Sequence, residues 1–165
     1  MRHFFVLVFF VFMCSTACKF NPNLQGEGTN YMQGVWHETS MPYQKQLLQH
    51  TIHNFRFTCD SFYIKLKTIA RVNTYPDSCY NSGVWSEYAK GTYFTQNDTL
   101  VLKGVFTKSN FKQKISGCYR SGTFNPIFII SEKKGVGMVL QNLQNHSSVI
   151  LKLKEKTTCK PQPLN

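Results

Sequence analysis

Apolar and polar residues alternate along most of the chain beyond residue 50, with the two-residue period of half-buried β-strands. In the stretch 54–59, Phe55, Phe57 and Cys59 fall on one face and the residues between them fall on the other. The alternation recurs in the stretches 62–67, 84–94, 99–106, 111–117, 128–131, 137–143 and 148–156. Turn-forming residues separate these stretches, so the pattern predicts an all-β fold of eight or nine short strands.

Glycines lie inside or beside several of the predicted strands, at Gly91, Gly104, Gly117 and Gly122. Interior strand glycines mark bulges or sharp bends, which a closed barrel needs. With one short helix expected at Gln44–Gln49, the favoured fold is a single up-and-down antiparallel β-barrel over 31–157. A tail over 158–165 follows it.

Both tryptophans stand in one repeated phrase, Tyr-x-x-Gly-Val-Trp-x-Glu. Its defining residues are Gly34, Trp36 and Glu38 in the first copy and Gly83, Trp85 and Glu87 in the second. We interpret the phrase as one packing solution used twice, in which Gly lets the strand start bend and Trp caps a barrel end. Side chains two residues apart share a strand face, so Glu38 and Glu87 are expected in the barrel cavity or at its mouth. A catalytic carboxylate pair and an internal duplication are the alternatives.

The first residues have the layout of an export signal. A basic start precedes the apolar run Phe4–Met13, which is about half as long as a membrane-spanning helix. The sequence Ser-Thr-Ala-Cys that ends at Cys18 resembles a bacterial lipobox, in which the Cys is lipidated and becomes the mature N-terminus. We therefore expect a signal peptide over 1–17, a lipid on Cys18 and a polar tether over 18–30. The alternative is ordinary cleavage that leaves a plain thiol.

Four cysteines follow the expected anchor: Cys59, Cys79, Cys118 and Cys159. An even number of widely spaced cysteines in an exported chain predicts two disulfides. When 111–117 is counted as a strand, the alternation of turns places Cys59 and Cys118 at one end of the barrel. Cys79 and Cys159 then lie at the other end. Because bridged Cα atoms lie within about 7 Å, this parity favours Cys59–Cys118 and Cys79–Cys159.

The sequence Gly-Val-Trp at 34–36, in the first strand of a small all-β chain, resembles the lipocalin fold, where that Trp closes one barrel end. The stretch 85–104 reads Trp-x-x-Tyr-x-x-Gly-x-Tyr and then Asn-Asp-Thr-Leu-x-Leu-x-Gly, which is similar to the lipocalin-like lipoproteins of Bacteroidota. The resemblance covers roughly 31–156 and implies a ligand-binding barrel on a lipid anchor. True lipocalins pack an Arg on the Trp; here Lys152 and Lys154 are the candidates for a cation–π contact.

Some lipoproteins of this kind carry the automatic name fumarate hydratase, which this sequence does not support. The stretch Ser40–Lys45 faintly resembles the Met-Pro-x-Lys-x-Asn loop of class II fumarases, but its Lys is one position too far along and no Asn follows. Those enzymes are large helical tetramers whose active sites combine several chains. An iron–sulfur version needs clustered Cys ligands, which this chain lacks.

Two classes of function are compatible with the expected barrel. The first is a module that binds a small apolar, amphipathic or anionic ligand. Its candidate pocket residues are Glu38, Phe55, Phe57, Glu87, Tyr88, Tyr93 and Phe106. The second is an envelope or inhibitor-type lipoprotein that binds another protein. Catalysis rests only on the two glutamates, so no enzyme activity and no cofactor are expected.

The formal net charge of +11 favours anionic partners such as lipid headgroups. No nucleic-acid-binding module is visible, so no nucleic-acid partner is expected. His50 and His53 would share a helix face but lie on opposite faces of a strand, so no metal site is expected. The expected state is a monomer, anchored in the outer membrane of the cell envelope and facing the periplasm.

Overall fold

The computed structural model describes residues 24–39 and 42–163. Its strands are β1 (Gly34–Glu38), β2 (Gln49–Thr58), β3 (Ser61–Ala70), β4 (Val84–Gln96), β5 (Thr99–Thr107), β6 (Thr123–Phe124), β7 (Ile127–Lys134), β8 (Gly137–Asn142) and β9 (Ser148–Lys156). Its helical pieces are short: the 3-10 turns η1 (Asn30–Met32), η2 (Pro42–Gln46) and η3 (Asn81–Gly83), and the helix α2 (Asp77–Tyr80). No helix within these described ranges is long and apolar enough to cross a membrane.

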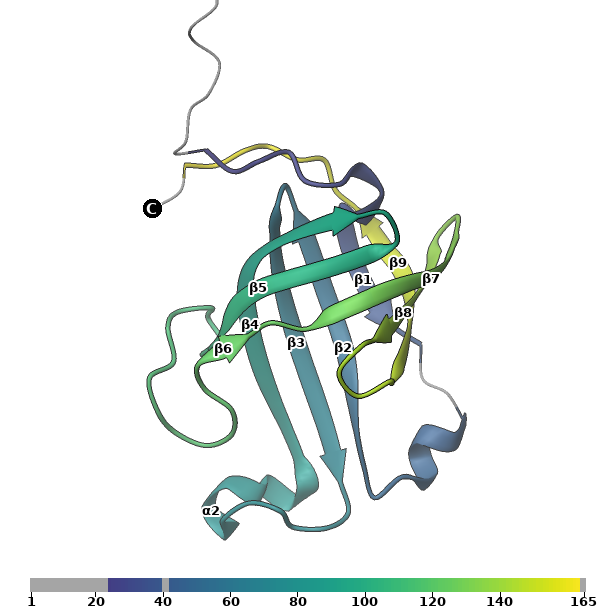
Figure 1. Cartoon of the computed structure of the whole chain (residues 1–165). Coiled ribbons are helices and arrows are strands. Elements are labelled where there is room, and N and C mark those ends of the chain that lie inside the picture. Colours follow the sequence, from purple (N-terminus) through teal and green to yellow (C-terminus); the bar gives the residue numbers. More distant parts are fainter. Residues whose placement is uncertain (1–23, 40–41, 164–165) are drawn as a thin grey trace, which may run out of the picture.

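Eight strands close into an antiparallel β-barrel, which confirms the fold predicted from the alternating pattern (Figure 1). Each of β1 to β4 pairs with the next strand, β5 pairs with β7, and β8 and β9 continue the order. The barrel closes because β1 pairs with both β2 and β9, with Trp36 opposite Phe55 on one side and Leu153 on the other. The remaining strand, the short β6, pairs with β5.

Alternate side chains of the barrel strands point inward and build one core. On β3, Phe62, Ile64 and Leu66 are buried while Lys65 and Lys67 are exposed, as the alternation predicts. Inward side chains from all the barrel strands meet in a single cluster. Burying an aliphatic or aromatic side chain of this size stabilises a fold by about 1.5–3 kcal/mol, so this cluster is the main source of stability.

Two interior glycines let β4 and β5 pack closely. Gly91 and Gly104 are direct partners in the register. A Cβ atom on Gly91 would overlap the carbonyl oxygen of Lys103, and one on Gly104 would overlap that of Lys90. The ring of Phe62 lies over the same place, 2.8 Å from where the Gly104 Cβ would stand. These glycines permit close approach of two strands whose register continues past them without a bulge.

The strands β2, β3 and β4 are longer than the wall that faces them. β1 pairs only with 54–57 of β2, and β5 pairs only with 88–96 of β4. The rest, 49–53 with 66–70 and 84–87, forms a three-stranded extension that we call the projecting ribbon (Figure 1). One end of the barrel is open because, in the part of the chain that the structure describes, no strand faces this ribbon.

The opposite end of the barrel is closed by Trp36 and the turn before it. The side chain of Trp36 is buried, and its indole N–H donates to the Met32 carbonyl oxygen at 2.7 Å. Beside it, the buried Gln33 amide donates to the Cys59 carbonyl oxygen at 2.8 Å and accepts from the Cys59 N–H at 2.7 Å. These bonds satisfy the backbone of the turn after β2 while the indole covers the core.

The cation at the closed end comes from a different strand than expected. The ammonium of Lys133 lies 3.6 Å from the ring centroid of Tyr31. Lys152 and Lys154, the candidates for a contact with Trp36, are both exposed on β9. The basic residue that covers an aromatic ring here therefore belongs to β7, and its partner is the tyrosine that opens the repeated phrase.

The predicted strand at 111–117 is wrong. Residues 108–122 form a long loop, which we call the mouth loop, and Gln113 makes an isolated bridge to Thr107. Ile115 is 83% exposed, so the alternation in this stretch reflects no buried face. The short helix expected at Gln44–Gln49 is also displaced, because η2 ends at Gln46 and β2 begins at Gln49.

The structure confirms two disulfides but not the pairing predicted from strand parity. Cys59 is bonded to Cys159, with Cα atoms 4.7 Å apart, and Cys79 to Cys118, with Cα atoms 5.5 Å apart. The predicted pairs, Cys59–Cys118 and Cys79–Cys159, were wrong because the count included a strand at 111–117. Removing one strand reverses the end that every later turn reaches, which moves Cys118 to the end of Cys79 and Cys159 to the end of Cys59.

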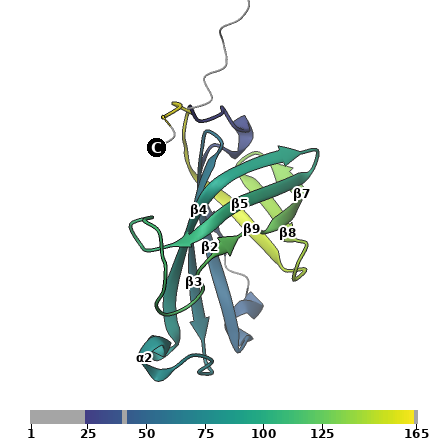
Figure 2. The same ribbon diagram turned by 60° about the vertical axis from the view of Figure 1, so that its left-hand side comes forward.

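The two ends of the described chain leave the barrel side by side at its closed end (Figures 1 and 2). Leu24 forms an antiparallel bridge with Pro163. The part of the expected tether that the structure describes, 24–30, therefore packs against the tail. Cys18 and the expected signal peptide lie outside the described residues.

Candidate binding pocket

The open end of the barrel holds a pocket of about 870 Å³, which we call the open-end pocket. Its walls come from the projecting ribbon, from η2, from the mouth loop and from the turn between β8 and β9. Its apolar lining includes Leu66, Phe106, Phe124, Phe128 and Val149. Its polar lining includes Glu38, His50, Thr51, His53, Arg120 and His146. A volume of this size lies within the range of small-molecule sites, roughly 300–1,000 Å³.

The repeated phrase runs in opposite directions on β1 and β4, and it brings its two glutamates to one level of the barrel. Glu38, at the end of β1, contacts His53 of β2. His53 is opposite Leu66 in the pairing of β2 with β3. Leu66 is in turn opposite Glu87 in the pairing of β3 with β4. The side chains of Glu38 and Glu87 are 2% and 3% exposed, so two carboxylates are buried on the same level.

Each copy of the phrase has a glycine with a positive φ at or just before the start of its strand. The φ angles are 143° at Gly34 and 80° at Gly83, and a Cβ atom at either position would overlap a backbone oxygen of a neighbouring strand. The tryptophans that follow, Trp36 and Trp85, are 2% and 4% exposed. The two copies therefore start a strand and bury a tryptophan in the same way at opposite ends of the barrel.

The carboxylate of Glu38 is fully engaged by its neighbours. One oxygen accepts the backbone N–H of His53 at 2.7 Å and lies 2.7 Å from the ring Nδ1 of the same residue. The other oxygen accepts the side-chain amide of Gln44 at 2.8 Å. Since a carboxylate can only accept, Nδ1 donates in this hydrogen bond. The ring that Glu38 orients in this way belongs to a residue that lines the pocket.

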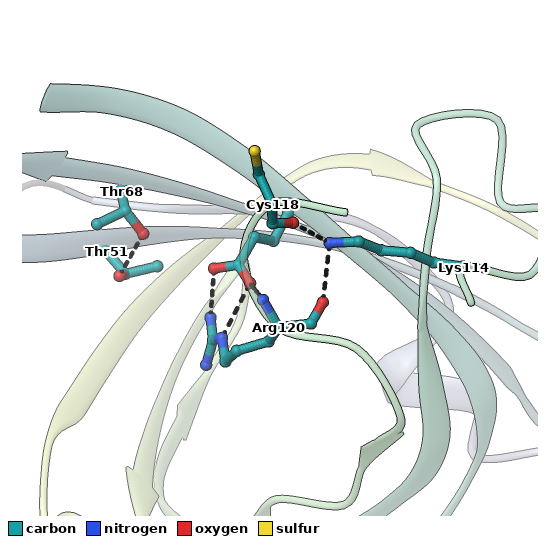
Figure 3. A network of polar contacts seen from close by, with 6 residues as sticks. Thr51, Thr68, Lys114, Cys118 and Arg120 are labelled. Carbon is teal, nitrogen blue, oxygen red and sulfur yellow. Dashed lines mark hydrogen bonds and ion pairs between the residues drawn. The ribbon is translucent and has the colours of Figure 1, made fainter. Parts of the chain in front are cut away.

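The carboxylate of Glu87 binds the mouth loop through Arg120 (Figure 3). The guanidinium donates from Nε at 3.0 Å and from Nη2 at 2.8 Å, and the Arg120 backbone N–H adds a third bond at 3.0 Å. Bidentate pairs of this kind fix orientation as well as position. The Lys114 ammonium donates to the carbonyl oxygens of Cys118 and Arg120, which holds the loop in shape around this pair.

Aromatic stacking also holds the mouth loop against the projecting ribbon. The ring of Tyr119 stacks on Trp85 with centroids 5.3 Å apart, and Tyr75 meets both rings edge-on. The Tyr119 hydroxyl donates to the Cys79 carbonyl oxygen at 2.6 Å. Desolvation, and then the nearby Glu87 carboxylate, raise the pKa of the Tyr119 phenol, so it remains a neutral donor. Together with the disulfide of Cys79, these contacts fasten the loop to the rim.

Several predicted pocket residues instead belong to the filled half of the barrel. Glu38 and Phe106 line the open-end pocket. Phe55 and Phe57 stack on each other with centroids 5.4 Å apart, inside the main core cluster. Tyr93 lies in the same cluster, where burial raises the pKa of its phenol. These three aromatic rings therefore fill space instead of lining it.

Tyr88 was wrongly expected in the pocket. It lies between the buried Glu87 and Ala89 on β4, so its side chain is on the outer face, where it contacts Phe111 at 5.9 Å between centroids. Arg120 lines the pocket but carried no signal in the sequence pattern. Its partner Glu87 was a candidate, and a buried carboxylate requires a basic or hydrogen-bonding neighbour, yet the sequence does not indicate which one.

The histidines at the pocket do not make up a metal site. His50 and His53 are three residues apart on β2, which places them on opposite faces of that strand. Within 24–39 and 42–163, no group of three or more His, Cys, Asp or Glu side chains is placed to hold a metal ion. The buried Nδ1 of His50 has no hydrogen-bond partner in the same ranges.

Fold and site together define a closed antiparallel barrel that is packed at one end and hollow at the other. Comparisons with protein-family models, with curated proteins and with solved structures found no match.

Proposed function

We propose that the chain is an exported, membrane-tethered lipoprotein whose lipocalin-like barrel binds a small amphipathic ligand in the open-end pocket. The observation that carries the proposal is the division of the pocket lining into an apolar part and a polar part. Sites for small molecules are concave and mostly apolar, with a few fixed polar groups that set orientation. The open-end pocket has both components.

The apolar part of the pocket is the exposed edge of the barrel core. Leu66, Phe106 and Phe128 line the pocket and also belong to the main core cluster. They come from β3, β5 and β7, so three strands contribute to the apolar floor of the pocket. A ligand's hydrocarbon part would rest on this floor and gain about 25 cal/mol for each Å² of apolar surface it buries.

The polar part of the pocket is fixed before a ligand arrives. His53 is oriented by Glu38, and Arg120 is oriented by Glu87. Each of these two side chains is hydrogen-bonded to a buried carboxylate, which restricts its rotation. Groups that are already oriented lose little conformational entropy on binding, which favours a polar ligand head at this level of the barrel.

Blocking the pocket should weaken the binding of an anionic amphipathic fluorophore, 1-anilinonaphthalene-8-sulfonate. Thr51 lines the pocket from the inner face of β2, so Thr51→Trp fills the space that the probe would occupy. Thr92→Trp puts the same side chain on the outer face of β4 and is the matched control. We expect Thr51→Trp to raise the Kd of the probe at least about 10-fold in a fluorescence titration, a loss of about 1.4 kcal/mol. Equal affinities in the two variants would contradict the proposed site.

Native mass spectrometry of protein purified from its own host tests the ligand class directly. We expect a bound lipid-like mass in the wild-type protein and its loss in Thr51→Trp. A bound polypeptide in place of a small molecule would favour the alternative function, an envelope protein that binds another protein through the barrel mouth.

The lipid anchor is tested by changing its attachment residue. We expect the wild-type protein to fractionate with membranes and Cys18→Ser to appear in the soluble periplasmic fraction, because acyl chains contribute about 0.8 kcal/mol per buried methylene. Metabolic labelling with a fatty acid should mark the wild type and not the variant. A soluble, unlabelled wild-type protein would show that the anchor is absent while leaving the pocket proposal intact.

A further inference from the structure

The outer face of β2 to β5 carries basic residues and no acidic ones. Its outward positions include five basic residues, Arg56, Lys65, Lys67, Lys90 and Lys103, which we call the basic outer face. No Asp or Glu occupies an outward position of these four strands, since Glu87 points inward. This face therefore holds five of the 19 Lys and Arg residues of the chain, with no carboxylate among them.

Aromatic rings lie between these cations. The guanidinium of Arg56 lies 4.4 Å from the ring centroid of Tyr63, and the Lys65 ammonium lies 6.0 Å from that of Tyr88. Phe111 of the mouth loop packs edge-on against both tyrosines, with centroids 5.0 and 5.9 Å away. The rings, packed edge to face, hold the cations in place along the sheet.

Apolar side chains also stand exposed on the same face. Phe94 is 45% exposed and Val105 is 42% exposed, on β4 and β5 respectively. The ammonium of Lys103 lies 5.5 Å from the ring centroid of Phe94. The boundary between lipid headgroups and acyl chains accommodates an exposed apolar side chain and a lysine side by side.

We propose that the basic outer face docks on the surface of an anionic lipid bilayer. This face is the outside of a barrel wall, and the open-end pocket lies on the inside. A linear polyanion is usually held in a groove that follows its backbone, whereas a convex face of mixed cations and apolar tips fits a flat, laterally fluid surface. The proposal does not depend on the ligand of the pocket.

The energetics of such a contact are electrostatic. Each Lys or Arg close to an anionic leaflet strengthens binding roughly fivefold, and the effect falls off within about a Debye length. With five such residues on one face, the contact would orient the barrel on the membrane even without the anchor at Cys18. Binding must then depend on anionic lipid and weaken as salt concentration rises.

The experiment uses Cys18→Ser protein recovered from the exported fraction, so that no acyl chain contributes. Its sedimentation with phosphatidylcholine vesicles is compared with and without phosphatidylglycerol. We expect binding only to the anionic vesicles, and a roughly 25-fold lower partition coefficient for Lys65→Gln combined with Lys90→Gln. The control combines Lys152→Gln with Lys154→Gln, which removes the same charge from exposed positions of β9.

A second variant, Phe94→Ser, separates the apolar contribution from charge and should lower partitioning without changing the salt dependence. Thermal melts show whether each variant remains folded. Three results would overturn the proposal: equal binding to neutral vesicles, an equal loss in the β9 control, or binding to heparin or single-stranded DNA with none to anionic vesicles. Titration with 1-anilinonaphthalene-8-sulfonate should be unchanged in all these variants, so failure here and failure of the pocket are distinguishable.

Discussion

Trp36→Ala is expected to lower the free energy of unfolding by about 3–5 kcal/mol, as deletion of a large buried aromatic side chain typically does. Trp36 belongs to the main core cluster, and its indole donates to the Met32 carbonyl oxygen. Truncation leaves a cavity beneath the closed end and an unpaired carbonyl in the turn that covers it. Denaturant unfolding under oxidising conditions, with the disulfides intact, measures the loss.

The second copy of the phrase provides the matched comparison. Trp85 lies outside the main core cluster and packs on Tyr75 and Tyr119, which belong to connecting segments. Its indole nitrogen has no hydrogen-bond partner within the described residues, so truncation breaks no such bond. We expect Trp85→Ala to cost at least about 1 kcal/mol less than Trp36→Ala. Equal or reversed losses would show that Trp36 does not close the barrel.

Arg120→Ala is expected to lower the free energy of unfolding by about 2–4 kcal/mol, because it leaves the buried Glu87 carboxylate without its bidentate partner. The loss stays below the upper limit for buried pairs because the Arg120 side chain is 50% exposed. Adding Glu87→Gln to Arg120→Ala should restore most of the stability, since a neutral amide costs less to bury than a charge. Chemical denaturation of the single and double variants gives the comparison.

A surface pair serves as the control for this effect. Lys134 and Glu132 lie 3.6 Å apart, with side chains that are 85% and 58% exposed. Lys134→Ala should change the free energy of unfolding by less than about 1 kcal/mol, as exposed pairs do. If Arg120→Ala were as mild, or if Glu87→Gln gave no recovery, the mouth loop would not depend on the pair that joins Glu87 to Arg120.

The barrel was predictable from sequence because the alternation of apolar and polar residues can be recognised in each strand separately. On β3 the alternation of Ile64 and Leu66 with lysines reflects which face is buried, and no distant residue is needed to read it. The stretch 111–117 shows why alternation alone can mislead. Phe111 packs on the outer face and Ile115 is exposed, so the same period arises in a loop that has no partner strand.

The candidate site was predictable in its buried carboxylates and in Phe106, which lines the pocket. Glu38 and Glu87 follow from the repeated phrase, because a strand places them on the face of a buried Trp. Their partners were not predictable: His53 depends on how β1 meets β2, and Arg120 depends on the path of the mouth loop. The predicted pairing of the cysteines was wrong for a related reason. One miscounted strand changes the barrel end that is assigned to every later cysteine.

Because both chain ends lie at the closed end, a mechanical force applied to either end enters the barrel there. β1 starts and β9 finishes at the same place, with Gly34 opposite Lys156. With the Cys59–Cys159 disulfide reduced, a pull between the two ends would open this seam one hydrogen bond at a time. The Cys59–Cys159 bond lies just beyond the seam and ties the tail to the turn after β2. Both ends of the described chain lie at the closed end, beside this disulfide. A barrel held by either end therefore has the mouth of its pocket on the side away from the point of attachment.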